Sequence, residues 1–148
     1  MPASDPSCIL CRIVADELPA SFVHRGATAT AFMDINPVTP GHLLVVPNGH
    51  YPLFADAPVE TFAHVMRIAR RIAIALETSS VQAEGVNLFL ADGEVAGQEI
   101  PHLHVHVIPR LPDDGFRIHA AAWDAERPAR GALDRQAEAI KAALGHET

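Results

Sequence analysis

The stretch GQEIPHLHVHVIPR occupies residues 97–110 and carries most of what the sequence predicts. Between residues 101 and 109 polar and apolar residues alternate, which is the period of a half-buried β-strand. On such a strand His102, His104 and His106 share one face, and the leucine and valines between them face the core. Imidazoles at this spacing can bind a transition metal, bind phosphate or act as a nucleophile. A solvated sheet face that carries three histidines is the alternative.

The loop ahead of the histidines favours an anion as the ligand. It contains Gly97, Gln98 and Glu99. A glycine lets the backbone approach a ligand closely, and successive backbone N–H groups form concavities that bind anions. The sequence therefore indicates a phosphate or oxyanion site more than a bare metal cage.

Outward from this region, the pattern predicts one α+β domain. The first three strands have short connections, which favours antiparallel pairing, and a long helix then crosses over. The expected elements are a short helix or turn at 7–17, strands at 21–25, 28–34, 42–47, 86–90 and 101–109, and helices at 58–77 and 131–144. In the long helix the residues at a 3.6-residue period, expected to face the core, are Phe62, Met66, Ala69, Ala73 and Leu76.

Composition excludes several classes of protein. The 148 residues, 49% hydrophobic and 20% charged, suit a single globular domain. Eleven basic against 18 acidic residues give a net charge of −7, which disfavours nucleic-acid binding through a general basic field. No apolar run is long enough to span a membrane, and the first residues do not form a signal peptide. We therefore expect a soluble cytoplasmic protein without a membrane partner.

The two cysteines, Cys8 and Cys11, form a Cys-x-x-Cys near the N-terminus. They can be a metal half-site, a redox pair or two buried small side chains. A thioredoxin-type redox pair lies between a strand and a helix, and no strand-like run precedes these cysteines. The redox interpretation is therefore the weakest of the three.

Three blocks together resemble the histidine triad (HIT) superfamily. Residues 97–110 resemble its signature, in which three histidines alternate with apolar residues. Residues 34–47, DINPVTPGHLLVVP, followed by His50, are similar to the family's first conserved block. Residues 8–13, CILCRI, resemble the N-terminus of its bacterial members. The chain is identified as a HIT domain with a core over 8–116 and a C-terminal helical extension over about 117–148.

The resemblance implies both a fold and a reaction. The implied fold is a five-stranded antiparallel sheet with one long crossover helix and a C-terminal helix, usually in a homodimer whose sheets join. The implied reaction is cleavage at the α-phosphate of a dinucleoside polyphosphate or nucleoside phosphoramidate, with a purine nucleotide as substrate and AMP or GMP as product. Two alternatives remain: a nucleotide-binding regulatory module with negligible turnover, and a metallohydrolase in which the three histidines hold a catalytic metal.

Residue by residue, the resemblance implies that His104 attacks phosphorus and forms a covalent nucleotidyl-histidine. His106 would hydrogen-bond a phosphate or leaving-group oxygen, and Gln98 with the backbone of 97–99 would hold the phosphate oxygens. Asp34 would bind the ribose hydroxyls, and His42 would support the histidine strand. The implied base pocket consists of Ile9, Leu10, Ile13, Phe32 and Ile35, although Ile9, Leu10 and Ile13 could equally be ordinary core.

The resemblance also suggests a structural zinc ion. Its implied ligands are Cys8, Cys11, His50 and His102, a Cys₂His₂ set of the kind that binds zinc tetrahedrally. A metal-free pair of buried thiols is the alternative.

Two positions depart from the family pattern. Ala91 stands where relatives usually carry Asn or Gln, so nucleotide affinity or substrate can differ. Glu99 stands where others place Ser or Thr; it could be a general acid, select an amine leaving group, or be a solvated carboxylate. The remaining histidines match no motif and are expected on the surface: His24, His64, His119 and His146.

Overall fold

The structure is a computed structural model that describes residues 3–117 and 126–145, so His119 and His146 lie outside the described residues. Residues 1–116 form one compact unit and 117–148 a second. The first unit contains α1 (Ile9–Val14), β1 (Phe22–Arg25), β2 (Ala29–Met33), β3 (Leu43–Pro47), η1 (Phe54–Asp56), α2 (Val59–Thr78), β4 (Gly85–Phe89), η2 (Glu94–Ala96) and β5 (Val105–Arg110). The second contains α3 (Arg130–Leu144).

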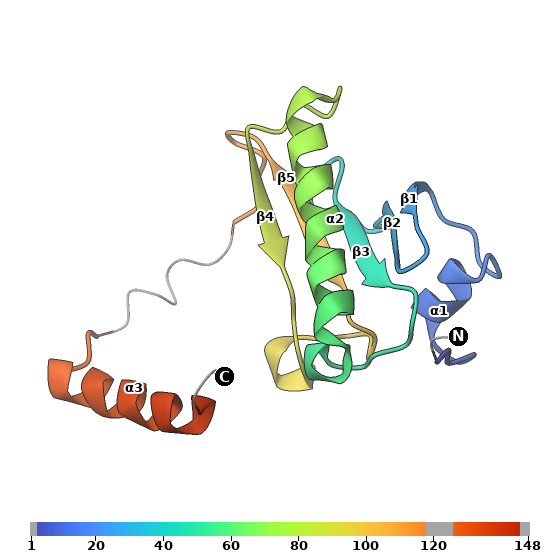
Figure 1. Ribbon diagram of the computed structural model, residues 1–148. Helices are drawn as coiled ribbons and strands as arrows, with labels where there is room; N and C mark the ends of the chain where they lie inside the picture. The colour runs from blue at the N-terminus through green and yellow to red at the C-terminus, as the bar shows by residue number, and fades with distance from the viewer. Residues whose placement is uncertain (1–2, 118–125, 146–148) are drawn as a thin grey trace. The chain divides into compact units, whose positions relative to one another are not determined.

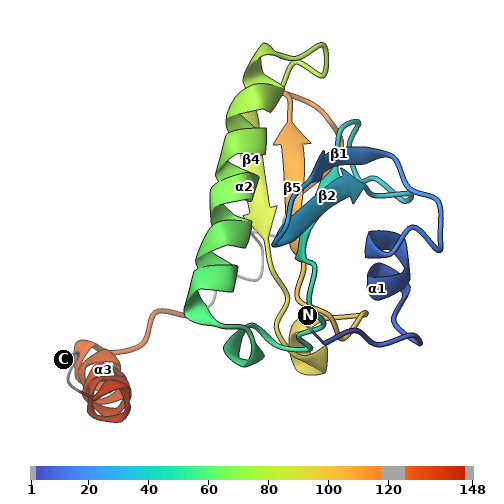
Figure 2. The same ribbon diagram turned by 45° about the vertical axis from the view of Figure 1, so that its right-hand side comes forward.

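The five strands form one antiparallel sheet in the order β1-β2-β3-β5-β4, which confirms the expected α+β class. The helices α2 and α1 lie on opposite sides of this sheet (Figures 1 and 2). Side chains alternate between the two faces, as strand geometry requires. In β3, Leu43 and Val45 pack with α2, while Leu44 and Val46 pack with α1. Since Leu44 is paired with His106, that histidine lies on the α1 face.

The histidine strand begins later than the sequence predicts. β5 starts at Val105 rather than at residue 101. Pro101 offers no backbone N–H to a sheet ladder, and the N–H of His102 donates to the carbonyl of Ile100 in a local turn. His102 and His104 therefore precede the strand, and only the alternation from Val105 onward follows the expected pattern.

The buried stripe of α2 also differs from the expected one. Its buried residues are Val65, Ile68, Ala69, Ile72 and Leu76, whereas Phe62, Met66 and Ala73 are only partly buried. The helix carries apolar residues over a wide arc, so packing on the sheet decides which stripe is covered. Phe62 instead packs on Phe54, with ring centroids 6.1 Å apart.

α3 spans 15 residues and has no buried residue. Its exposed apolar side chains include Leu133, Ile140 and Leu144. Within the described parts of the chain, neither this helix nor any other is long and apolar enough to cross a membrane.

Candidate functional site

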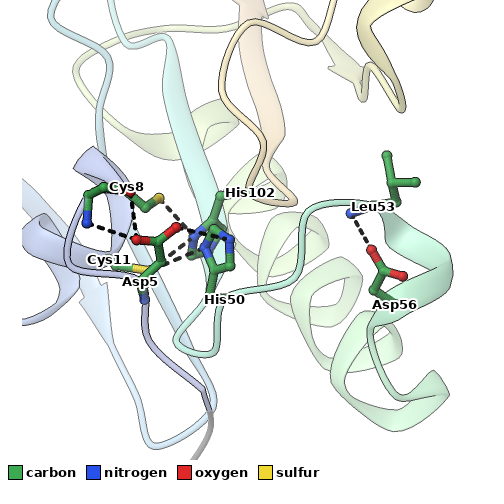
Figure 3. A network of polar contacts seen from close by, with 8 residues as sticks. Asp5, Cys8, Cys11, His50, Leu53, Asp56 and His102 are labelled. Carbon is green, nitrogen blue, oxygen red and sulfur yellow. Dashed lines mark hydrogen bonds and ion pairs between the residues drawn. The ribbon is translucent and has the colours of Figure 1, made fainter.

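The first cluster of reactive side chains joins the N-terminal segment to the residues before β5. Cys8 Sγ lies 3.4 Å from His102 Nδ1, and Cys11 Sγ lies 3.5 Å from the same atom. Cys11 Sγ is also 3.4 Å from His50 Nδ1. Figure 3 shows the four side chains turned toward one another. Their ligand atoms all lie within 4.8 Å of one another, so the fold assembles the four residues of the expected zinc set.

The donor set fits a zinc ion. With Zn–S near 2.3 Å and Zn–N near 2.0–2.1 Å, a tetrahedral S–Zn–N edge measures about 3.6 Å, close to the three S···N distances. The single lone pair on His102 Nδ1 cannot accept linear hydrogen bonds from two thiols at once, whereas one cation satisfies all four donors. Burial lowers the pKa of His102 to about 4, which keeps its ring neutral as metal ligation requires.

Both histidines of this cluster have outer partners. The Nε2–H of buried His102 donates to the carbonyl of Pro47 at 3.0 Å, which directs the Nδ1 lone pair at the sulfurs. His50 Nε2 lies 3.8 Å from Asp5 Oδ2. A carboxylate behind a metal-binding imidazole orients the ring and raises its basicity. Sequence reasoning missed Asp5, because no spacing rule connects a polar N-terminal residue with a histidine 45 positions later.

His104 is buried and holds one defined tautomer. Its Nδ1 lies 2.6 Å from the carbonyl oxygen of His102. A carbonyl can only accept, so Nδ1 carries a proton, and Nε2 is the nitrogen on which this ring can present a lone pair. The side chain is 6% exposed, and its ring centroid is 5.1 Å from that of His106. The geometry thus leaves Nε2 of His104 as the ring nitrogen available to a ligand.

Beside His104, a second pair of histidines, His42 and His106, is joined by a hydrogen bond. The N–H of Val38 donates to His42 Nδ1 at 3.1 Å, so the proton of His42 is on Nε2. That Nε2–H donates to His106 Nδ1 at 2.9 Å. His106 therefore presents an Nε2–H. Burial lowers the pKa of both rings, that of His106 to about 4, so both are neutral near pH 7.

Asp34 lies beside this pair. Its Oδ2 is 3.5 Å from His42 Nε2 and 3.9 Å from His106 Nδ1, and its Oδ1 accepts the N–H of Asn36 at 2.8 Å. The structure thus brings together four side chains: His106 within β5, His104 just before β5, His42 just before β3 and Asp34 just after β2.

The loop ahead of the histidines borders a cavity of about 640 Å³ lined by Leu53, Gly93, Glu94, Gly97, Gln98, Glu99 and Pro101. Gly97 has φ +90°, and nothing lies within 4 Å of an added Cβ. A glycine is therefore needed for the backbone conformation rather than for packing. The side-chain amide of Gln98 is engaged at both ends, because Oε1 accepts the N–H of Gly93 and Nε2 donates to the carbonyl of Pro52, each at 2.7 Å. Gln98 braces the loop.

The residues of the expected base pocket separate into two groups. Leu10 and Phe32 belong to the core between α1 and the sheet, and Ile13 packs at its edge. Ile9 and Ile35 are 48% and 87% exposed.

Two expectations about histidines are wrong. His102 faces the cysteines, so it does not share a metal with His104 and His106, which contradicts the metallohydrolase alternative. His24 is half-buried rather than on the surface, and its Nε2 is a buried atom with no hydrogen-bond partner in the described structure. His64 is also half-buried.

Comparisons with known proteins agree with this geometry. A sequence profile of the HIT domain matches residues 15–113. An adenosine 5'-monophosphoramidase from Saccharomyces cerevisiae is 34% identical over 122 residues, covering 82% of this chain and 73% of the yeast protein. A Streptococcus mutans protein of known crystal structure is 32% identical with a TM-score of 0.89, covering 98% and 90% of the two chains. A zinc-bound histidine triad family protein from Mycobacterium smegmatis is 34% identical with a TM-score of 0.73, covering 93% and 95%.

Proposed function

The chain belongs to the HIT domain family, and from that premise we propose that it is a nucleotide hydrolase or transferase acting through a covalent nucleotidyl-histidine on His104. It cleaves at the α-phosphate of a nucleoside phosphoramidate or dinucleoside polyphosphate. One observation carries the proposal: the hydrogen bond from His104 Nδ1 to the His102 carbonyl leaves the Nε2 lone pair free. A nucleophile must present such a lone pair to phosphorus.

The reaction proceeds in two displacements. In the first, a bond forms between His104 Nε2 and the α-phosphorus while the bond from phosphorus to the leaving group breaks. The leaving group departs with its electron pair and takes up one proton. In the second, water attacks the same phosphorus, the P–Nε2 bond breaks, and the proton lost by the water balances the one taken up before. The products are a nucleoside monophosphate and the free leaving group.

The neighbouring side chains supply positioning and charge stabilisation. His106 donates its Nε2–H to a phosphate oxygen or to the leaving-group atom, in the direction set by His42. The backbone of 97–99 would hold the phosphate oxygens. The N–H groups of Gly97 and Gln98 already donate to the carbonyls of Glu94 and Gly93 within the loop, so a phosphate shares these donors or takes the N–H of Glu99. Asp34 accepts hydrogen bonds from the ribose hydroxyls.

The substrate is a purine nucleotide adduct, and the product is AMP or GMP. Support for a phosphoramidate comes from the yeast relative, whose name describes it as an adenosine 5'-monophosphoramidase. A dinucleoside polyphosphate presents the same α-phosphorus with a phosphate leaving group. Glu99, exposed beside the loop cavity, favours a cationic amine over a phosphate.

Cys8, Cys11, His50 and His102 would hold a structural zinc ion. When bound, the ion neutralises the two thiolates and cross-links the N-terminal segment to the residues before β5. The M. smegmatis relative is described as zinc-bound and supports this assignment.

A second candidate is a nucleotide-binding module with negligible turnover. The observation that favours it is Ala91, which is 7% exposed and offers no polar side chain to a nucleotide.

We propose that the chain is one HIT domain with its core at 8–116 and a helical extension at about 117–148, and that it forms a homodimer. β4 is an edge strand of the sheet, and its Leu88 and Phe89 are 45% and 48% exposed. An uncovered edge strand with apolar side chains can pair with a second copy.

The test is AMP release from an adenosine 5'-phosphoramidate and from diadenosine tetraphosphate. The proteins compared are the wild type, His104→Ala and the control His64→Ala, which changes a histidine of α2. We expect activity to be lost only in His104→Ala, and a nucleotidyl adduct to appear by mass spectrometry after rapid quenching. Equal activity in all three proteins would overturn the covalent mechanism. Nucleotide binding without turnover in the wild type would favour the binding module.

A further inference from the structure

The helix α3 carries apolar side chains that stay exposed in the described part of the chain. None of its 15 residues is buried, and Leu133, Ile140 and Leu144 are 36%, 69% and 76% exposed. A helix of this length is marginal in water by itself, because most helical stability in proteins comes from the packing of an apolar face. A surface that covers this face would therefore stabilise α3.

The apolar residues of α3 have the spacing of a coiled coil. Leu133, Ala137, Ile140 and Leu144 follow one another at intervals of four, three and four residues, which is the alternation of d and a positions in a heptad repeat. Residues at these positions form a narrow stripe along a helix, and a second helix matches such a stripe. The spacing therefore indicates a helix as the partner.

The sizes of these side chains favour a second copy of α3 that runs in the opposite direction. In an antiparallel pair each a position faces a d position of the other helix, so Leu133 faces Leu144 of the partner subunit. Ala137 likewise faces Ile140 of the partner subunit, and a small side chain meets a large one. A parallel pair would set alanine against alanine and leave a gap. The two-fold axis of the antiparallel pair makes each contact occur twice.

The charges beside the stripe favour the same orientation. Asp134 and Lys141 occupy the two e positions of the repeat. In an antiparallel pair each e position faces an e position of the other helix, so Asp134 lies opposite Lys141 of the partner subunit, again twice. A parallel pair would set the e positions against g positions, where Gln136 and Ala143 carry no charge. Within one helix Lys141 Nζ lies 3.5 Å from Glu138 Oε1, an exposed ion pair that contributes little and can be exchanged.

We propose that α3 docks against α3 of a second copy of this chain as an antiparallel two-helix coiled coil, centred between Ala137 and Ile140. The inference rests on the proposed homodimer, because two heptads are too short to hold two chains together alone. Subunits that are already joined raise the effective concentration of α3, and the short pair then forms. The nucleotide site and His104 take no part in it.

Disulfide trapping on the full zinc-loaded chain tests both the partner and its direction. In the double variant Leu133→Cys/Leu144→Cys the two positions of one helix lie about 16 Å apart, at 1.5 Å per residue, so they cannot bond within a chain. We expect mild oxidation to give a covalent dimer bonded between residues 133 and 144. Mass spectrometry of the digested product identifies these bonds and separates them from any at the native cysteines. The matched control is Arg135→Cys/Ala142→Cys on the outer face of the pair, which should stay monomeric under denaturing conditions.

The single variant Leu133→Cys decides the direction. In the antiparallel pair its two copies lie about 16 Å apart along the axis, so we expect no bond between them. Efficient bonding of residue 133 to residue 133 would show a parallel pair and overturn the proposal. Equal bonding in the double variant and in its outer-face control would show random collision and overturn it as well.

Exchange of the charges tests the ion pairs. Asp134→Lys and Lys141→Asp are each added to Leu133→Cys/Leu144→Cys, singly and together. We expect each single exchange to slow bond formation about fivefold, the effect of losing two exposed ion pairs, and the combined exchange to restore it. Equal rates in all four proteins would contradict the antiparallel arrangement.

Analytical ultracentrifugation of the wild type separates this inference from the proposed homodimer. A dimer whose residues 133 and 144 do not bond in the double variant would overturn the pairing of α3 and leave the homodimer standing. A monomeric wild type would overturn both. AMP release by the wild type and His104→Ala tests the proposed reaction independently of either result.

Discussion

The Nε2 of His42 lies 2.9 Å from the Nδ1 of His106, and the direction of this hydrogen bond is set by the N–H of Val38 on the far side of the His42 ring. The bond from Val38 to His42 and the bond from His42 to His106 together leave the proton of His106 on Nε2, so this atom is a donor and not a lone pair. The pair connects the residue just before β3 with β5, next to His104.

Replacing His42 by phenylalanine should slow the chemical step. His42→Phe keeps a ring in the buried position but removes the donor to His106, so His106 can turn its lone pair toward the substrate. We expect kcat to fall about 10²-fold, the range for loss of an oriented acid–base group, with KM nearly unchanged. Steady-state AMP release measures both constants. His64→Phe is the matched control. An equal loss of kcat in both variants would argue against a role for the hydrogen bond from His42 to His106.

The neutral state of His106 should make stability depend on pH. Burial lowers its pKa to about 4 from an ordinary value of 6.5, with His104 and His42 adding to the effect. Between these pH values the unfolded chain binds a proton that the folded chain does not, so the free energy of unfolding falls as the pH falls. The contribution is complete above pH 6.5 and is lost toward pH 4, at up to about 1.4 kcal/mol per pH unit.

Urea unfolding of the wild type and His106→Asn at pH 7, 6 and 5 checks this sign. The zinc ligands are the same in both proteins, so the difference between their slopes isolates His106. We expect the free energy of unfolding to fall less steeply with decreasing pH in the variant. Parallel slopes would show that His106 does not resist protonation.

Asp5→Asn should weaken zinc binding without removing a ligand. The amide keeps the size of the side chain but removes the charge 3.8 Å from His50 Nε2. Loss of an outer carboxylate typically costs about 10- to 100-fold in metal affinity. Competition with a chromophoric chelator measures the change. Asp113→Asn, which removes an equal charge from an exposed position, is the control and should keep wild-type affinity.

Gln98→Glu should loosen the loop that carries residues 97–99. The carboxylate can still accept the N–H of Gly93, but it cannot donate to the carbonyl of Pro52 and instead repels it. We expect KM for the nucleotide to rise and hydrogen exchange of the Gly93 and Gly97 amides to speed up. Gln136→Glu on exposed α3 is the control. Unchanged exchange together with a raised KM would mean that Gln98 acts on the substrate rather than on the loop.

Local sequence patterns predicted the elements well wherever a single face is buried. The run of β3 placed that strand correctly, and the alternation at Val105 and Val107 predicted the buried face of β5 although not its start, because a period of two is a property of the strand alone. The prediction for α2 missed the buried residues Val65, Ile68 and Ile72 by one position. The apolar arc of this helix is wider than its contact with the sheet, so packing on the sheet decides which apolar residues are buried.

The sequence by itself determined the α+β class and the family, since alternation and motifs are written in neighbouring residues, and the family resemblance then implied the four side chains of the candidate zinc set. Only the tertiary structure decided that His102 turns away from His104, that Asp5 stands behind His50, and that the amide of Gln98 is used within the loop. Each of these depends on a contact between segments distant in the chain. Such contacts follow from how the layers pack, and no local pattern encodes which partner a buried hydrogen-bonding group will find.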